Sequence, residues 1–365
     1  MNDEKYIKYN SQRDLLFVFG AGTSIADGAP LQKDILPKIL KDDYKYSNPA
    51  KLVKTFIENN FDLVDDNYPS LESVFGYLDY FISKRESLGG EFTTIKLITI
   101  KEFLIRLIHH SISKLNNSKG IYRKFWEAIE KTDKNISIIT TNYDTLLDEA
   151  FDFLYPSKAL IDYCINFMNY EQYDKINAFD WWINPRIPVP IWDNKIPVPI
   201  KIIKIHGSLN WKYCNCCNQV LLTPWDTELD IDTLEFKGYI GASCDNPEEI
   251  IFDLECPNDN NSFSTFIIPP SHIKELNHPV ISKLFDEAAE EIRKTKKIIF
   301  IGYSLPEADI HIKALFKKNL TEKIEIEVVD PFLTEKIKSN YRSISKKVTF
   351  IKDSFENYIE KITNT

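Results

Sequence analysis

Short apolar runs that end in polar turns limit the fold of this chain more than any other feature. The first run, Leu15–Phe19, stops at Gly20-Ala21-Gly22, and apolar residues at helical spacing follow over Leu31–Leu40. This order predicts a strand, a tight turn and a helix. Further runs of strand length are Ile136–Thr140, Lys201–Ile205, Lys297–Ile301, Ile324–Val329 and Val348–Ile351. Because several of them also lead into helical patterns, we predict an α/β fold with a doubly wound, Rossmann-like parallel sheet covered by helices on both faces.

Three long segments interrupt this pattern and are predicted to be insertions. The first shows repeated helical spacing, the second is rich in proline and aromatic residues, and the third carries most of the cysteines. They are residues 41–133, 151–200 and 211–266, respectively. We therefore expect one domain with a helical insertion and a smaller Cys-containing insertion. The domain would span residues 1–365, with a Rossmann-like core of residues 14–40 and 134–365.

The Pro/aromatic-rich segment contains the sequence IPVPI twice, at Ile187–Ile191 and at Ile196–Ile200. Proline cannot donate a hydrogen bond to a neighbouring strand, so alternate prolines are not expected in the interior of a sheet. We therefore expect both copies to form an extended edge or a clasp.

The composition indicates a globular protein without a broad nucleic-acid or membrane surface. Of the 365 residues, 27% are charged and 43% hydrophobic, and the net charge is −9. An acidic chain without a long Lys/Arg block disfavours broad binding to nucleic acids or anionic membranes. The N-terminus lacks the apolar core of a signal peptide, and no segment approaches the roughly 20 apolar residues of a membrane span. We therefore expect a cytoplasmic protein, whose cysteines are free thiols or metal ligands rather than disulfides.

The glycine-rich turn after the first strand is the strongest local motif. Glycines at such a turn let the backbone approach a pyrophosphate, which backbone N–H groups at a helix N-terminus then bind. The spacing departs from G-x-G-x-x-G, because Gly28 comes six residues after Gly22. A turn without a ligand is the alternative interpretation.

Polar residues also follow two other predicted strands. Asn142 and Asp144 come directly after Ile136–Thr140, at the strand end where ligands of open α/β sheets bind. The alternative is an Asx cap that opens a helix at Asp144. His206 follows Lys201–Ile205, and its unperturbed pKa near 6.5 suits a general base, although a lone histidine is more often structural.

Two later strands end in similar turns. Gly302 and Ser304 follow Lys297–Ile301, and Asp330 follows Ile324–Val329. A carboxylate at such a position can accept hydrogen bonds from ribose hydroxyls. Each of these turns is generic alone, but parallel strands would bring all of them to one edge of the sheet.

Four of these motifs, in this order, resemble the sirtuins. GAGTSIADGAP at Gly20–Pro30 resembles the sirtuin signature GAG-x-S-x-x-x-G-[IL]-P, and TTNYD at Thr140–Asp144 is similar to TQN-x-D. HGS at His206–Ser208 resembles the turn that carries the catalytic histidine, and IGYSL at Ile301–Leu305 resembles the late G-[TS]-S-L. The chain reads Pro-Leu-Gln-Lys at Pro30–Lys33 where deacetylases continue Pro-Asp-Phe-Arg. Together with GYSLPEAD, IIPP and HGSLNW, this resembles the sirtuin-like NAD hydrolases of bacterial antiphage defence.

The resemblance implies a role for each matching residue. Asn142 would orient the nicotinamide ribose and a water, and His206 would act as a base near the ribose hydroxyls. Asp144 would hold the carboxamide of nicotinamide. The pyrophosphate would bind Gly20, Ala21, Gly22, Thr23 and Ser24, and the adenosine half would contact Gly302, Ser304 and Asp330.

The implied activity is hydrolysis of NAD⁺ at the nicotinamide–ribose bond, giving nicotinamide and ADP-ribose and depleting NAD⁺ in abortive antiphage defence. The alternatives are an NAD-dependent protein deacylase or ADP-ribosyltransferase, and a non-catalytic NAD or ADP-ribose sensor. About 14 residues precede the first strand, and the chain ends shortly after the last. We therefore expect the trigger to come from elsewhere: a helicase-like ATPase or Argonaute-type partner chain, a ligand, or self-assembly, with a homo-oligomer as the default.

The cysteine pattern also resembles a sirtuin feature. Cys214 and Cys217 form a C-x-x-C, with Cys216 between them, and sirtuins often carry a zinc module of two such pairs here. The other pair in this chain would be Cys244 and Cys256, which lie 12 residues apart rather than three. The resemblance implies a structural zinc ion held by Cys214, Cys217, Cys244 and Cys256, and free thiols are the alternative.

Overall fold

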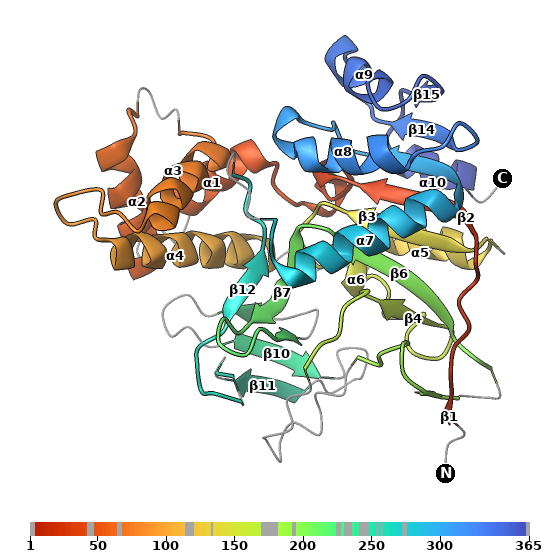
Figure 1. The fold of residues 1–365 in the computed structure, drawn as a ribbon, viewed down its shortest axis with the longest axis horizontal. Helices are drawn as coiled ribbons and strands as arrows, with labels where there is room; N and C mark the ends of the chain where they lie inside the picture. Colours follow the sequence, from red (N-terminus) through yellow and green to blue (C-terminus); the bar gives the residue numbers. More distant parts are fainter. Residues whose placement is uncertain are drawn as a thin grey trace.

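The apolar runs pair with one another in a single parallel sheet. The computed structural model describes residues 4–41, 47–63, 68–113, 120–132, 134–168, 182–191, 195–223, 228–229, 236–240, 248–252, 255–256, 258–271 and 276–362. The sheet has seven strands in the order β15-β14-β13-β2-β3-β6-β4, all parallel (Figure 1). They are β2 (Arg13–Phe19), β3 (Ile136–Thr140), β4 (Ala159–Asp162), β6 (Val198–Lys204), β13 (Thr295–Ile301), β14 (Glu325–Val329) and β15 (Val348–Ile351). The predicted fold class, α/β with a doubly wound Rossmann-like sheet, is confirmed.

The strand order reverses beside β2. The next strand of the sheet, β3, pairs on one side of β2, whereas the much later β13 pairs on the other. Phe19 at the end of β2 lies opposite Thr140 of β3 and Ile301 of β13. The turns after these three strands therefore begin side by side, and open α/β sheets bind ligands at such a reversal.

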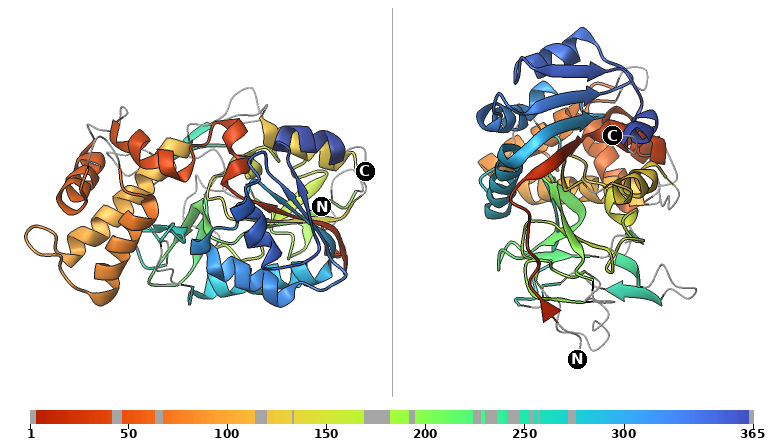
Figure 2. Two further views of the ribbon diagram at one scale, coloured as in Figure 1. Left: turned by 90° about the horizontal axis from the view of Figure 1, so that it is seen from above. Right: turned by 90° about the vertical axis from the view of Figure 1, so that its right-hand side faces the viewer.

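Helices cover both faces of the sheet (Figure 2). α7 (Pro279–Lys294) and α8 (Ile310–Asn319) lie on one face, and α5 (Ile121–Glu130) and α10 (Phe355–Ile362) lie on the other. The short helices α6 (Leu146–Glu149) and α9 (Glu335–Arg342) complete the layers. Within the part of the chain that the structure describes, no helix has both the length and the apolar character needed to cross a membrane.

Four helices pack on one another beyond the carboxyl edge of the sheet, at the left of Figure 1. Ser47 and Ser70 start the second and third of them by accepting hydrogen bonds from Ala50 N and Ser73 N. The apolar faces of the four helices form a core separate from that of the sheet. We call this group the helical unit: α1 (Gln32–Lys41), α2 (Asn48–Asn60), α3 (Leu71–Lys84) and α4 (Thr94–Ser113).

Short antiparallel strands form the remaining sheets. The middle strand of one, β7 (Gly207–Tyr213), starts directly after the turn that carries His206, which fixes that turn between two sheets. Its partners are β8 (Val220–Leu222) and β12 (Ser264–Ile267). The others are β9 (Glu228–Leu229) with β10 (Phe236–Ile240) and β11 (Glu248–Phe252), and β1 (Glu4–Lys5) with β5 (Val189–Pro190).

The two IPVPI copies have different structures. The first forms β5, whose short pairing with β1 is the expected clasp. The second opens β6, which lies between β3 and β4, so the expectation that prolines exclude it from an interior strand is wrong. Pro199 lies opposite Leu160 of β4, whereas the pairing of β6 with β3 begins only at Lys201. The backbone N–H that Pro199 lacks is therefore not needed for the hydrogen bonds between β6 and β3.

The apolar runs of the sequence do not predict β4.

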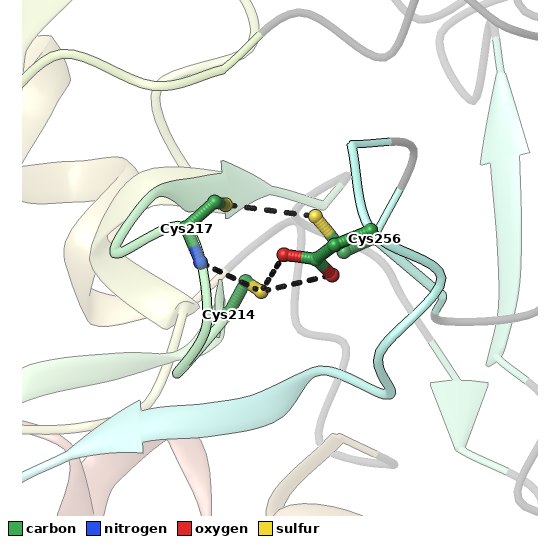
Figure 3. A group of neighbouring side chains, drawn as sticks. Cys214, Cys217 and Cys256 are labelled. Carbon is green, nitrogen blue, oxygen red and sulfur yellow. Dashed lines mark hydrogen bonds between the residues drawn. The ribbon is translucent and has the colours of Figure 1, made fainter.

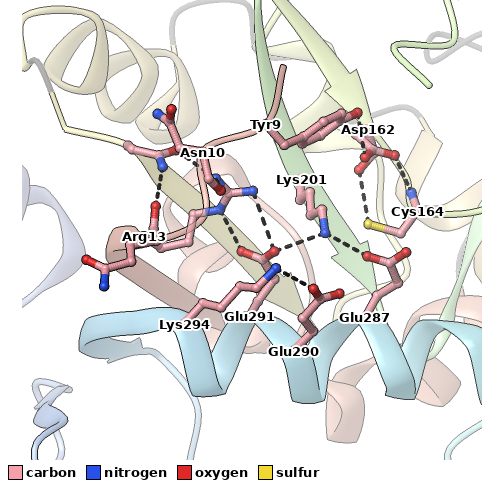
Figure 4. Close-up of polar contacts among 12 residues, drawn as sticks. Tyr9, Asn10, Arg13, Asp162, Cys164, Lys201, Glu287, Glu290, Glu291 and Lys294 are labelled. Atoms are coloured by element: carbon pink, nitrogen blue, oxygen red, sulfur yellow. Dashed lines mark hydrogen bonds and ion pairs between the residues drawn. The ribbon is translucent and has the colours of Figure 1, made fainter. Parts of the chain in front are cut away.

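A buried ion network connects β2 and β6 to α7 (Figure 4). Arg13 Nε lies 2.7 Å from Glu291 Oε2. Lys201 Nζ lies 3.0 Å from Glu291 Oε1 and 2.7 Å from Glu287 Oε2. Because Arg13 is on β2 and Lys201 is on β6, the two glutamates connect separate strands through one helix.

Candidate functional site

A cavity of about 540 Å³ lies at the carboxyl edge of the sheet, where the strand order reverses. The helical unit closes one side of it through residues such as Leu71 and Ile108. We call it the carboxyl-edge cavity. Most of the residues predicted to bind or act on a ligand line it: Ala21, Gly22, Thr23, Ser24, Asn142, Asp144, His206, Gly302, Ser304 and Asp330. The polar turns of five strands thus meet around one space.

The glycine-rich turn forms two consecutive 3-10 helices, η1 (Ala21–Thr23) and η2 (Ile25–Asp27). Gly22 N donates a hydrogen bond to Gly302 O at 2.9 Å. A Cβ on Gly22 would lie 2.8 Å from Gly302 Cα, and a Cβ on Gly302 would lie 2.6 Å from Thr23 N. These glycines are therefore required because the two turns touch backbone to backbone, whether or not a phosphate binds there.

The side chain of Asn142 is held by the glycine-rich turn. Its Nδ2 lies 3.1 Å from Gly20 O, 3.1 Å from Ser24 Oγ and 3.3 Å from Thr23 Oγ1. Gly20 does not line the cavity itself but fixes this amide through its carbonyl. Hydrogen bonds from the turn after β2 therefore fix the orientation of the Asn142 amide without a ligand.

Tyr122 is a residue of this site that the sequence analysis missed. It comes from α5, and its hydroxyl lies 2.7 Å from Thr23 Oγ1 and 2.8 Å from Ser24 Oγ. Burial raises the pKa of Tyr122, so its hydroxyl stays protonated. Asp27 holds the start of α5 by accepting a hydrogen bond from Ile121 N at 2.6 Å. The only sequence signal was a tyrosine on an apolar helical face, which is typical of core packing.

Asp144 is buried and linked to the same turn. Its Oδ2 accepts a hydrogen bond from Ser24 Oγ at 2.9 Å, and its Oδ1 accepts one from Leu146 N at 3.2 Å. The second contact is an Asx turn just before α6 and not the expected cap, because the N-cap residue of α6 is Thr145. The carboxylate of Asp144 also lines the cavity. Burial raises the pKa of Asp144, although Lys204 and these hydrogen bonds oppose the shift.

Lys204, the last residue of β6, binds the backbone of Asp144. Its ammonium donates hydrogen bonds to Asp144 O at 2.6 Å and to Asp148 Oδ2 at 2.7 Å. Both side chains of the ion pair are buried, with exposures of 1% for Lys204 and 0% for Asp148. The charge of Lys204 is therefore compensated within the protein and fixes the loop that carries Asn142 and Asp144.

His206 is buried in the turn between β6 and β7 and lines the same cavity. Its Nε2 lies 2.8 Å from Nε2 of His311, which is in the first turn of α8. Asp309, in the 3-10 helix η4 (Glu307–Asp309), has a carboxylate oxygen near both rings and accepts a hydrogen bond from Tyr303 OH at 2.8 Å. His311 had no motif around it, so the sequence did not predict this pairing.

Three cysteines of the Cys-containing module also come together (Figure 3). Cys217 Sγ lies 3.6 Å from Cys256 Sγ, and Cys214 Sγ lies 3.3 Å from Asp259 Oδ2. These three cysteines and Asp259 each have one ligand atom within 4.8 Å of those of the others. Hydrogen bonding from Asn261 lowers the pKa of Asp259 to about 2, so its carboxylate is charged. Cys244 lies outside the described residues.

This donor set fits a zinc ion. Thiolate and carboxylate ligands of Zn²⁺ lie about 2.0–2.3 Å from the ion, so the sulfur atoms of a tetrahedral site lie about 3.8 Å apart. Asp259 was not predicted, because a carboxylate three residues after a lone cysteine carries no recognisable spacing.

Comparison with family models assigns the chain to one family, and a search of solved structures finds similar chains. The sequence profile of the family described as SIR2-like domain matches residues 136–325. Among solved structures, a Sir2 homologue in complex with NAD has 12% sequence identity and a TM-score of 0.47, with 97% of this chain and 89% of that chain covered. A mutant Sir2 homologue bound to ADP-ribose has 12% identity and a TM-score of 0.44, covering 97% and 91%. Sir2Tm bound to a propionylated peptide has 13% identity and a TM-score of 0.42, covering 97% and 93%. No curated protein matches the sequence.

Proposed function

The chain belongs to the SIR2-like domain family, and on this premise we propose that it hydrolyses NAD⁺ at the nicotinamide–ribose bond, giving nicotinamide and ADP-ribose. The observation that carries this proposal is the meeting of Asn142 and His206 in the carboxyl-edge cavity. Asn142 follows β3 and His206 follows β6, and the neighbouring turn from β2 aims the amide of Asn142.

The reaction needs no nucleophile from the protein. As the bond to nicotinamide breaks, positive charge develops on the ribose, and a positioned water attacks its C1′ atom. Asn142 orients the ribose and this water, and His206 accepts the proton that the water loses. Asp144 holds the nicotinamide carboxamide, and the electrons of the broken bond leave with nicotinamide.

The remaining residues bind the rest of NAD⁺. The pyrophosphate would contact the turn Gly20–Ser24 at the end of β2, of which Ala21–Ser24 line the cavity. Gly302, Ser304 and Asp330 follow β13 and β14 on the other side of the reversal and would contact the adenosine half. An acidic protein would in this way bind an anionic substrate through backbone dipoles rather than through basic side chains.

The test is nicotinamide release from NAD⁺ by the purified chain. Asn142→Ala and His206→Ala should each cut turnover by about 10²–10⁴-fold while NAD⁺ binding stays within a few-fold. Asn59→Ala, on the exposed side of α2, is the matched control and should behave as the wild type. Binding without cleavage in every condition would favour a sensor, and release only with an acylated peptide would favour a deacylase.

In cells, this hydrolysis would deplete NAD⁺ as an abortive antiphage response of a cytoplasmic enzyme. The support is the resemblance of its motifs, and an unregulated NAD⁺ hydrolase would kill its own host, so we expect a trigger. We expect a homo-oligomer controlled by a helicase-like ATPase or Argonaute-type partner chain. Cells that carry the wild type should lose NAD⁺ after phage infection, and cells that carry Asn142→Ala should not.

A structural zinc ion would be held by Cys214, Cys217 and Cys256 in the Cys-containing module. Either Cys244 or Asp259 would supply the fourth ligand. Such an ion adds no chemistry to the reaction, because four protein ligands leave no open position. Its effect would be to hold together segments that are distant in the sequence.

A further inference from the structure

Three side chains that can bind a metal converge beside the carboxyl-edge cavity. His206 lies between β6 and β7, Asp309 ends η4, and His311 is the second residue of α8. One ligand atom of each lies within 4.8 Å of the others. We propose that this triad binds a divalent transition-metal ion such as Zn²⁺, and that the bound ion stops NAD⁺ cleavage. The second half of the proposal rests on the proposed function.

The two imidazoles share a hydrogen bond that a metal ion could replace. Each ring directs the same atom, Nε2, at the other, across 2.8 Å. Zinc lies about 2.0–2.1 Å from an imidazole nitrogen, so two tetrahedral nitrogen ligands lie roughly 3.4 Å apart. Separating the two rings by about half an ångström would place both lone pairs on one ion, with the carboxylate of Asp309 as the third ligand.

The carboxylate is already oriented for this role. Tyr303 OH donates a hydrogen bond to Asp309 Oδ2 at 2.8 Å, and both side chains are buried. Ligating carboxylates are commonly held by such outer hydrogen bonds, which fix the oxygen that faces the ion. Tyr303 is in turn fixed beside Gly302, at the end of β13.

The donor set also selects the class of ion. Two imidazoles and one carboxylate favour Zn²⁺ and its transition-metal neighbours over Mg²⁺ and Ca²⁺, which prefer all-oxygen sites. Three protein ligands leave at least one position open, unlike the four protein ligands of a structural zinc site. His311 also lines a second cavity of about 780 Å³ beside α7 and α8, so an ion could reach the triad without crossing the carboxyl-edge cavity.

An ion at this place would oppose the proposed reaction in two ways. A metal-bound nitrogen of His206 has no lone pair left to accept a proton. The ion would also put positive charge near the ribose, where positive charge develops as nicotinamide leaves. The metal-bound chain would therefore be the resting form, and loss of the ion would permit turnover.

Binding can be tested with Co²⁺ as a spectroscopic probe of the full-length protein. We expect two kinds of bound Co²⁺: one with sulfur-to-metal charge-transfer absorption from the cysteine cluster, and one without it. Only the second should disappear in His311→Gln and in Asp309→Asn. His110→Gln, a histidine on α4, is the matched control and should keep both. Identical Co²⁺ spectra in wild type and both triad variants would overturn the proposal.

Inhibition is tested separately by adding Zn²⁺ to protein dialysed against a weak chelator. Nicotinamide release by the wild type should fall at least tenfold and return with excess chelator, whereas the rate of His311→Gln, whatever its size, should not respond. A wild-type rate that ignores Zn²⁺ overturns the inhibitory half even if Co²⁺ binds. If no nicotinamide is ever released, the inhibitory half falls with the proposed function, and the Co²⁺ spectrum still decides the metal site.

Discussion

Ser24 and Asp144 come from turns after different strands, yet Ser24 Oγ donates a hydrogen bond of 2.9 Å to Asp144 Oδ2. The same hydroxyl accepts a hydrogen bond of 3.1 Å from Asn142 Nδ2. One small side chain therefore sets the distance between the two polar residues that follow β3. The glycine-rich turn thus positions the proposed catalytic amide in addition to offering its backbone to a ligand.

Ser24→Ala should lower nicotinamide release by about 10–100-fold, because the amide of Asn142 and the carboxylate of Asp144 lose their common partner. The free energy of unfolding should fall by about 1–3 kcal/mol, since Asp144 is buried and loses a hydrogen bond. Steady-state kinetics and urea unfolding measure the two effects. Ser83→Ala, at an exposed position of α3, is the control. An unchanged rate in Ser24→Ala would show that Asn142 does not need this contact.

Tyr122→Phe removes one hydroxyl from the same network and leaves the ring packed in the core. We expect kcat to fall by about tenfold with little change in KM, because the hydroxyl touches Thr23 and Ser24 rather than a substrate. Tyr80→Phe, on an exposed part of α3, is the matched control. A change confined to stability would indicate that Tyr122 is only a core residue.

Gly302→Ala should disrupt both the fold and NAD⁺ binding. Gly302 has φ +58°, and an added Cβ would lie 2.6 Å from Thr23 N. Gly90 has a nearly equal φ of +56°, but a Cβ there would meet nothing within 4 Å. Gly90→Ala should cost about 1 kcal/mol from the backbone conformation alone, and Gly302→Ala about 2–4 kcal/mol. Equal losses in thermal unfolding would contradict the backbone contact between the turns.

The sequence was sufficient to predict six of the seven strands of the parallel sheet, all except β4, and the polar turns that follow them. β3 is buried throughout, so its run Ile136–Thr140 is apolar without alternation, and parallel pairing then places all strand ends at one edge. It could not predict Tyr122, because a tyrosine on a helical apolar face looks the same whether its hydroxyl meets a core or an active-site loop. His311 and Asp309 meet His206 only through the crossing of α8, which no local pattern records.

The ion network of Glu287 predicts a pH effect on stability. Burial would raise the pKa of Glu287, but ion pairs with Arg186 and Lys201 outweigh it and lower the pKa below its usual value. A depressed carboxylate pKa stabilises the fold above the unfolded value, about 4.3, and this contribution is lost as the pH falls toward the folded pKa. Glu287→Gln should therefore cost about 1–2 kcal/mol at pH 7 and little at pH 3. Urea unfolding from pH 3 to pH 7 measures the free energy of unfolding of both proteins. A difference between them that does not change with pH would contradict the assignment.

Removal of metal should affect the Cys-containing module before the sheet. Cys214 and Cys217 come from the turn between β7 and β8, and Cys256 lies close to β12, so a bound zinc ion would close the loop between these strands. A strong chelator should release about one zinc ion from this module, in addition to the ion of the His206–Asp309–His311 triad, and lower the midpoint of thermal unfolding, because binding energy of a structural metal is folding energy. Cys217→Ser should reproduce that loss, and Cys216→Ser should not, since Cys216 is exposed and is not one of the four converging ligands. Asp259→Asn separates the two candidates for the fourth ligand: zinc affinity falls if Asp259 binds the ion and stays unchanged if Cys244 does.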